Sequence, residues 1–421
     1  MTYQVQPNAE PRAIGIHDLS FATTRFVLPH AELARRNGVP VEKYHIGIGQ
    51  QSMSVPAADE DIVTMAAAAA APILKRHGKE RIRTVLLATE TSIDQSKAAG
   101  VYVHSLLGLS PHARVVELKQ ACYAATAALQ CAIGLIHQNP QEQVLVIASD
   151  VSQYDLASPG EATQGAGAVA LLISADPALL RVDGPSGLYC ADIMDFWRPN
   201  YRQTALVEGR MSVSAYLRAV EGAWSDYTLR GGREIEAFHS FCYHQPFTKM
   251  AHKAHAHLLR CQDEALLPDS AFSGGISPAE DTKLSEELVR AVGYALRYTT
   301  EYNAVIGNSY TASMYLALAS LLDHAPDLTG HHIGLFSYGS GSVAEFFGAT
   351  VVAGYRAALR TEAHAEALSQ RIPVDYSTYR RLRRYALPQD GGEYRFPRQT
   401  GGLYRLAGIS GHKRQYIALE D

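Results

Sequence analysis

A cysteine that stands between a predicted strand and a predicted helix is the first candidate for chemistry. Cys122 lies in ELKQACYAATAALQ, where the apolar run at residues 113–118 predicts a strand and residues 124–137 predict a helix. Backbone N–H groups and the dipole at the start of a helix stabilise a thiolate, and the small neighbouring residues admit an acyl group. A buried, inert thiol is the alternative for Cys122, and packing is the role expected of Cys131 within the helix.

A glutamate and a histidine stand at the ends of two other apolar runs. Glu90 closes residues 83–90 (RTVLLATE), and His244 lies in residues 238–247 (FHSFCYHQPF). Because the carboxyl ends of strands line the ligand crevice of open α/β sheets, Glu90 is a candidate general acid or base, with a turn or helix-cap carboxylate as the alternative. His244 could donate to a carbonyl or shuttle a proton, although a histidine packed in the core has the same pattern.

Three further polar residues are weaker candidates for substrate binding. Asn308 precedes the apolar stretch at residues 312–324, so it could contact a ligand or cap a helix. Lys249 and Lys253 follow His244 and could meet phosphates, with solvated surface lysines as the alternative.

No metal site or nucleotide motif is predicted. His252, His255 and His257 lie together in HKAHAH, but we find no cysteine or carboxylate at ligand spacing, and we expect a solvated helix face. The G-x-G sequences in GIGQ and YGSGS match neither the dinucleotide-binding nor the P-loop pattern. QGAGAVALLI instead indicates a close approach of two backbones that leads into a buried strand. We therefore expect neither a metal nor a redox cofactor.

The composition is that of a globular chain with nearly balanced charge. Of 421 residues 47% are hydrophobic and 19% charged, and 38 Lys+Arg against 42 Asp+Glu give a net charge of −4. No global basic excess favours nucleic acid. Five cysteines without C-x-x-C spacing indicate reduced thiols, and neither a signal peptide nor a membrane span is visible, so we expect a cytoplasmic protein.

Strand-like and helix-like stretches alternate along the chain, which predicts an α/β fold. Apolar runs without alternation indicate strands buried on both faces; besides those above they occupy residues 143–150, 167–174 and 332–341. Further helices are expected at residues 61–77, 283–298 and 312–324. From about residue 360 the chain is charged, and RRLRRY with the following residues predicts a solvated surface helix and loop, with an acidic-partner site as the alternative.

In combination the motifs resemble the hydroxymethylglutaryl-CoA synthases, condensing enzymes of the thiolase superfamily, in their bacterial form. The resemblance covers nearly the whole chain in one order: HIGIGQQSMSV, ATETSID, ELKQACYAATAALQ, VLVIASD, EATQGAGAVALLI, DIMDFWRPN, SFCYHQPFTKM, IGNSYTASMYLALASLL and GLFSYGSGSVAEFF. It implies a thiolase-like fold in which two similar α/β halves form a five-layered αβαβα core. The expected halves are residues 1–178, with Glu90 and Cys122, and residues 179–421, with His244 and Asn308.

The resemblance also implies the site residues, one position at a time. The catalytic residues match Glu90 in ATETSID, Cys122 in QACYAAT and His244 in YHQPFTKM. The substrate-binding residues match Asn308, Tyr154, Lys249, Lys253 and Ser340. Cys122 would accept an acetyl group from acetyl-CoA, Glu90 would deprotonate it for condensation with acetoacetyl-CoA, and hydrolysis would release the product for the mevalonate pathway. A homodimer is implied.

Four other interpretations share parts of this pattern. A polyketide β-branching synthase has the same catalytic residues but takes an acceptor on an acyl carrier protein. A ketoacyl-carrier-protein synthase of the initiating type would use Cys122, His244 and Asn308 but needs no glutamate base, and a biosynthetic thiolase needs a late second cysteine, whereas the last one here is Cys261. An inactive scaffold would leave Cys122 without a role.

Overall fold

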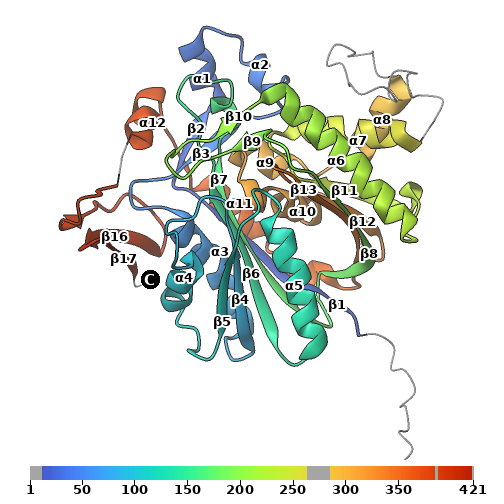
Figure 1. Cartoon of the computed structure of the whole chain (residues 1–421), viewed down its shortest axis with the longest axis horizontal. Coiled ribbons are helices and arrows are strands. Elements are labelled where there is room, and N and C mark those ends of the chain that lie inside the picture. Colours follow the sequence, from blue (N-terminus) through green and yellow to red (C-terminus); the bar gives the residue numbers. More distant parts are fainter. Residues whose placement is uncertain (1–11, 263–284, 385–386, 420–421) are drawn as a thin grey trace, which may run out of the picture.

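A single mixed sheet runs through the centre of the computed structural model (Figure 1), which describes residues 12–262, 285–384 and 387–419. Nine strands follow one another in the order β11-β12-β13-β8-β1-β7-β6-β4-β5. Their bounds are β1 (Ile14–Thr23), β4 (Ile82–Ala88), β5 (Arg114–Leu118), β6 (Gln143–Val151), β7 (Ala166–Ala175), β8 (Leu180–Cys190), β11 (Phe238–Tyr243), β12 (His332–Gly339) and β13 (Val343–Val351). Only two residue pairs join β1 to β8, so the sheet consists of two parts with a narrow junction.

Helices and the two sheet parts alternate in five layers. Helices α3 (Ile62–His77) and α4 (Ala99–Leu106) cover the outer face of the first part, and α6 (Gly209–Leu229), α7 (Thr248–Gln262) and α8 (Glu286–Ala295) cover that of the second. Between the parts lie α5 (Ala124–Gln138) and α10 (Ser313–His324), whose apolar side chains form one core with both. The α/β class and the αβαβα layering agree with the prediction.

The strands between helical layers are buried on both faces, as the unbroken apolar runs predict. In β6, Val144 and Val146 face the central core while Leu145 and Ile147 face α3. β5 differs, because it lies at the edge of the sheet and its residues are half-exposed or exposed. The prediction of burial on both faces is therefore wrong for residues 113–118.

Local signals position the helices close to the predicted bounds. Asp61 precedes α3 and accepts hydrogen bonds from the backbone N–H groups of Val63 and Thr64, a capping box that begins the helix. α5 begins two residues after Cys122. Of the helix predicted at residues 283–298, α8 accounts for the middle, and positions 283 and 284 lie outside the described residues.

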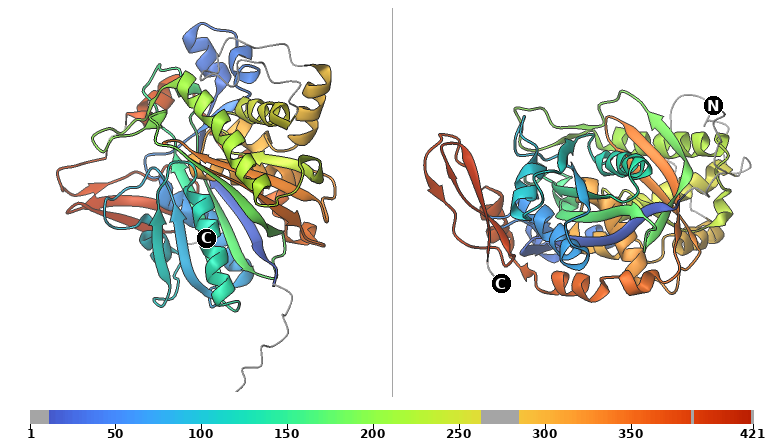
Figure 2. Two further views of the ribbon diagram at one scale, coloured as in Figure 1. Left: turned by 45° about the vertical axis from the view of Figure 1, so that its right-hand side comes forward. Right: turned by 90° about the horizontal axis from the view of Figure 1, so that it is seen from below.

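The charged C-terminal segment is more ordered than predicted. In α12 (Tyr376–Arg383) Tyr379 is buried, where its hydroxyl accepts a hydrogen bond from Gln164, and Arg383 donates to the Tyr154 carbonyl. The expected loop beyond it contains a three-stranded sheet that extends from one side of the molecule (Figure 2). Its strands are β15 (Tyr394–Arg395), β16 (Tyr404–Ser410) and β17 (Lys413–Ala418). The predicted surface helix is therefore present, with residues 380–384 half-exposed or exposed, whereas part of the expected loop is a sheet.

The remaining elements are short. They are β2 (Phe26–Pro29), β3 (Ser52–Val55), β9 (Phe196–Trp197), β10 (Leu206–Val207), β14 (Ile372–Pro373), α1 (His30–Asn37), α2 (Glu42–His45), α9 (Glu301–Ile306), α11 (Thr361–Ser369) and the 3₁₀ turns η1 (Glu161–Thr163), η2 (Ile235–Ala237), η5 (Tyr310–Ala312) and η6 (Tyr355–Ala358). None of the helices in the described part of the chain combines the length and apolar character that crossing a bilayer requires.

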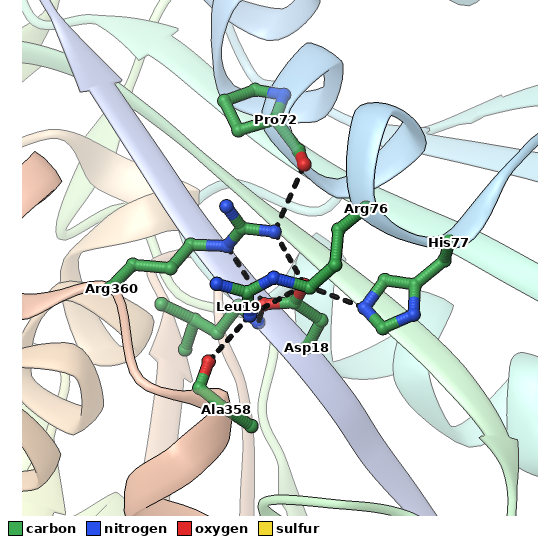
Figure 3. Close-up of polar contacts among 7 residues, drawn as sticks. All are labelled: Asp18, Leu19, Pro72, Arg76, His77, Ala358 and Arg360. Carbon is green, nitrogen blue, oxygen red and sulfur yellow. Dashed lines mark hydrogen bonds and ion pairs between the residues drawn. The ribbon is translucent and has the colours of Figure 1, made fainter.

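A buried carboxylate joins the first strand to the segment after the last strand of the main sheet. Asp18 on β1 accepts hydrogen bonds from Arg360, from His77 and, at 3.3 Å, from Arg76 (Figure 3). Arg360 also donates to the carbonyl of Pro72 in α3. These bonds fix both β1 and the segment that carries Arg360 to helix α3.

Candidate active site

A mostly apolar cavity of about 210 Å³ collects five of the predicted site residues. Cys122, Tyr154, His244, Asn308 and Ser340 all line it. Aromatic side chains supply much of the remaining wall: Phe196, Tyr216, Phe247, Tyr310 and Tyr338. Such a pocket suits an acyl chain whose polar atoms meet a few fixed groups.

The thiol of Cys122 contacts the carboxyl group of Glu90. Sγ lies 3.4 Å from Oε2, although the two residues follow different strands, β5 and β4. Burial, and next the charge of Glu90, raises the pKa of the Cys122 thiol well above its usual value. The sequence favours a thiolate at this helix start, whereas burial and the nearby carboxylate outweigh the helix dipole and favour the protonated thiol. The resting group is a thiol.

Burial also changes the acidity of Glu90. It raises the pKa of this carboxyl to about 8, with a further increase from the charge of Asp150 and a partial decrease from Arg198. A carboxyl with this pKa can accept and return a proton near neutral pH.

Asp150 fixes the loop that carries Glu90. One of its carboxylate oxygens accepts hydrogen bonds from the backbone N–H groups of Glu90 and Thr91, at 2.9 and 3.0 Å, and from both threonine hydroxyls at positions 89 and 91. The other accepts from the N–H and hydroxyl of Thr311, three residues beyond Asn308. Arg198 donates to the carbonyl of Glu90. Two sides of the site are thus connected through one buried side chain.

His244 reaches the cavity as a neutral ring. The backbone N–H of His244 donates to the Phe336 carbonyl, and the backbone carbonyl of His244 accepts from the Tyr216 hydroxyl. These two bonds fix the backbone that carries the ring. Burial lowers the pKa of the imidazole to about 3. Nδ1 is buried and has no hydrogen-bond partner among the described residues. An unpaired buried nitrogen is costly, and a bound substrate can satisfy it.

Two glycines bring Asn308 into the cavity. A Cβ on Gly307, whose φ is +86°, would lie 2.0 Å from the Gln164 carbonyl oxygen, and one on Gly165 would lie 2.5 Å from the Gly307 carbonyl carbon. This confirms the close backbone approach predicted from QGAGAV. The Oδ1 of Asn308 accepts from the Tyr310 N–H at the start of the turn η5, and the residue lines the cavity.

Asp195 supports the loop that carries Ser340. Its carboxylate accepts from the Tyr338 hydroxyl at 2.7 Å and from the Gly341 N–H at 2.9 Å, and the Ser340 carbonyl accepts from Gln120. Tyr154 packs edge-on against Phe196 on the opposite wall.

The two lysines do not line this cavity. Lys249 is half-buried on α7 and borders a separate hollow with α2 and α9, while Lys253 is exposed one turn further along. Cys131 is exposed on α5, so the prediction of a packed thiol there is wrong. His255 is buried, which corrects the expected solvated face of the HKAHAH helix.

Sequence reasoning missed three residues that position the site. Asp150, Asp195 and Arg198 received no role, although each stands in a motif that carries the resemblance, VLVIASD or DIMDFWRPN. A charged residue at the end of a strand buried on both faces is the signal that could have identified Asp150.

Comparisons with known proteins identify the family of the chain. The family profile described as hydroxymethylglutaryl-coenzyme A synthase N terminal matches residues 10–178, and the corresponding C-terminal profile matches residues 181–379. The hydroxymethylglutaryl-CoA synthase of Enterococcus faecalis is 40% identical over 367 residues, which are 87% of this chain and 90% of that protein. The chain belongs to the hydroxymethylglutaryl-CoA synthase family.

Solved structures from the family extend over 97% of the chain and all of their own. A hydroxymethylglutaryl-CoA synthase complexed with CoA is 37% identical with a TM-score of 0.86, and a synthase complexed with 3-hydroxy-3-methylglutaryl-CoA is 35% identical with a TM-score of 0.85. The curacin-pathway synthase in complex with holo donor carrier protein is 30% identical with a TM-score of 0.87. The thiolase-like fold predicted from the sequence is confirmed.

A polyketide member of the family is more distant in sequence. The 3-hydroxy-3-methylglutaryl-ACP synthase PksG of Bacillus subtilis is 32% identical over 306 residues, 68% of each chain. The predicted hydroxymethylglutaryl-CoA synthase function, and with it the acyltransferase class of condensing enzyme, is confirmed by the closer match to the CoA-type relatives.

Proposed function

We propose that Cys122, Glu90 and His244 perform the synthase reaction on substrates that are both CoA thioesters. The observation that carries the proposal is the 3.4 Å contact of Glu90 with the thiol of Cys122, which lines the same cavity as His244 and Asn308. The higher identity to the Enterococcus synthase than to PksG favours acetoacetyl-CoA over a carrier-bound acceptor.

The first step is acetyl transfer to sulfur. The Cys122 sulfur attacks the carbonyl of acetyl-CoA, the bond to the CoA sulfur breaks, and the thiol proton moves to the departing CoA. The bond that breaks and the bond that forms are both thioester carbon–sulfur bonds, and the proton passes from one sulfur to another. The step therefore needs a dry, well-oriented site more than a strong base.

The second step forms the carbon–carbon bond. Glu90, as carboxylate, takes a proton from the methyl group of the Cys122-bound acetyl, and the resulting carbanion attacks the ketone carbon of acetoacetyl-CoA. Glu90 then returns the proton to the new tertiary alkoxide. His244, neutral at this pKa, and the Asn308 amide orient the acceptor through its thioester carbonyl. Water finally hydrolyses the bond to Cys122 and releases the product.

An acceptor assay tests the proposal. The enzyme, charged with acetyl-CoA, is given acetoacetyl-CoA or an acetoacetyl group on an acyl carrier protein, and product formation is followed by mass spectrometry. We expect turnover with the CoA acceptor to exceed that with the carrier acceptor; the reverse order would assign the polyketide type. An inactive scaffold would leave no acetyl group on the peptide that contains Cys122.

Four further predictions from the sequence remain proposals: the two halves, the role of the lysines, the homodimer and the location in the cell. The family profiles divide between residues 178 and 181, which supports halves at 1–178 and 179–421. Lys249 and Lys253, outside the cavity, are proposed to meet the CoA phosphates at its approach. The homodimer rests on the resemblance and is tested by light scattering. The cytoplasmic location rests on the reduced thiols expected from the cysteine pattern.

A further inference from the structure

Helices α6 and α7 bring a carboxylate, an imidazole and a thiol together outside the cavity. Glu221 belongs to α6, whereas His257 and Cys261 are four residues apart on one face of α7. The Nε2 of His257 lies 3.6 Å from Cys261 Sγ and 3.6 Å from Glu221 Oε2. The three potential ligand atoms all lie within 4.8 Å of one another. A carboxylate and a cysteine therefore join one histidine of HKAHAH, which corrects the expectation from the sequence.

We propose that Glu221, His257 and Cys261 bind a divalent metal ion of the Zn²⁺ class, with water in the fourth position. A thiolate, an imidazole and a carboxylate form a mixed sulfur, nitrogen and oxygen set that suits Zn²⁺ and Co²⁺ and disfavours the hard ions Mg²⁺ and Ca²⁺. This inference does not rest on the proposed roles of the cavity residues.

Two of the three distances between the ligand atoms are close to those of tetrahedral coordination. Zn–S and Zn–N bonds of roughly 2.3 and 2.05 Å at a tetrahedral angle place the sulfur and nitrogen about 3.6 Å apart. The observed separation between Cys261 Sγ and His257 Nε2 is 3.6 Å. The same geometry needs about 3.4 Å between nitrogen and oxygen, and the pair His257–Glu221 stands at 3.6 Å. The Glu221 side chain is 58% exposed, so it is free to close the remaining gap by rotation.

Metal binding exchanges one proton for the metal ion. The metal–sulfur bond forms as the Cys261 thiol releases its proton to solvent, and no oxidation or reduction takes place.

A metal at this point would link two helices that border the cavity. Tyr216 and Val213 of α6 line the cavity, as does Met250 of α7. The two helices run side by side along that edge of the molecule (Figure 1). Binding to the folded state alone stabilises it, so the metal should raise the melting temperature.

Titration of the full chain with Zn²⁺ alone tests the site. Because Cys122 and Glu90 form a second thiol–carboxylate pair, the titrations use the Cys122→Ala protein. We expect one Zn²⁺ per chain, a rise in melting temperature, and a thiolate-to-metal charge-transfer absorption when Co²⁺ replaces Zn²⁺. Cys261→Ser should abolish that absorption, and Cys261→Ser or His257→Gln should weaken Zn²⁺ binding by about tenfold or more.

The matched control is Cys131→Ser, which removes an exposed thiol outside the cluster. It should leave the stoichiometry, affinity and absorption unchanged. Absence of a Co²⁺–thiolate absorption in the Cys122→Ala protein, or equal Zn²⁺ affinity with and without the Cys261 thiol, would overturn the proposal. Circular dichroism of each variant separates loss of the ligand from loss of the fold.

Discussion

The Sγ of Cys122 lies 3.4 Å from Oε2 of Glu90, so the nucleophile and the proposed base share one buried position. Burial, and next the charge of Glu90, raises the pKa of the Cys122 thiol, whereas the hydrogen bond from that thiol lowers the pKa of Glu90, because two negative charges at this separation are unfavourable. Once an acetyl group occupies the sulfur, only Glu90 can carry the charge. The order of steps, acetylation before deprotonation, follows from this arrangement.

Glu90→Ala should separate the two half-reactions. Acetylation of Cys122 should persist, since loss of the carboxylate removes one cause of the raised thiol pKa. Condensation should fall by about 10²-fold or more, because no base remains beside the acetyl methyl group. Mass spectrometry of the Cys122 peptide measures the first step and product formation the second. Loss of acetylation with intact later steps would show that Glu90 has another role.

The condensation rate should rise with pH up to about 8. Glu90 acts as a base in its ionised form, and its pKa is raised to about 8, so the active carboxylate is a minority at pH 7 and a majority above 8. Single-turnover condensation by pre-acetylated enzyme, measured from pH 6 to 9, checks this. A profile that is flat across pH 6–8 contradicts it.

Arg198 provides a matched test of that pH profile. Its positive charge lowers the pKa of Glu90, so Arg198→Gln should move the midpoint to higher pH, whereas Arg198→Lys should keep it closer to the wild-type value. A purely structural role for Arg198 would reduce the rate in both variants without moving the midpoint.

Glu90→Gln should stabilise the protein in a pH-dependent way. The carboxyl titrates near 4.5 when unfolded and near 8 when folded, so its destabilising effect is absent below the first value, grows between them and is constant above the second. The gain in free energy of unfolding at pH 8.5 should be on the order of 2–5 kcal/mol, and near zero at pH 4.5. Urea denaturation measures it. Glu142→Gln, at an exposed ion pair, should show no such dependence.

Apolar runs predicted five of the strands that two helical layers bury, β4, β6, β7, β11 and β12, and the polar residues near their ends led to Glu90 and His244. β1, β8 and β13 were not predicted from such runs. Asp18 interrupts the apolar run of β1, and β8 contains polar residues along a half-exposed face. The raised pKa of the Cys122 thiol comes from burial and next from a carboxylate 32 positions away, and no local sequence pattern contains either cause.

Contacts between distant elements explain the other omissions. Asp150 bonds to Thr311 across 161 positions, and Glu221 meets His257 from another helix. Such pairings follow from packing, whereas sequence spacing reports only neighbours on one element. The resemblance identified the motif that contains Asp150 but gave its carboxylate no role.

Gly307→Ala should impair acceptor binding while acetylation continues. The new Cβ would meet the Gln164 carbonyl oxygen at 2.0 Å and would occupy a φ of +86°, so the backbone before Asn308 must move. We expect a loss of about 1–3 kcal/mol of stability and a higher KM for acetoacetyl-CoA. Gly330→Ala is the control, because its φ is +77° but nothing lies within 4 Å of the added Cβ. Equal effects on KM in both variants would contradict the positioning of Asn308 by this contact.

Asp18→Ala should be among the more destabilising changes outside the cavity. Asp18 is fully buried and Arg360 only 8% exposed, so removal of the carboxylate leaves a guanidinium buried beside α3 without its partner (Figure 3). Loss of one member of a buried ion pair costs about 3–5 kcal/mol. Asp226→Ala removes a partly exposed carboxylate that pairs with Arg230 and accepts from the Leu188 backbone N–H, and it should cost much less than Asp18→Ala. Urea unfolding of the two variants compares them directly. Asp18→Asn keeps an acceptor oxygen but not the charge, so its loss of stability should fall between those of the two alanine variants. If Asp18→Ala loses as little stability as Asp226→Ala, then Arg360 finds water or another acceptor when the pair is broken.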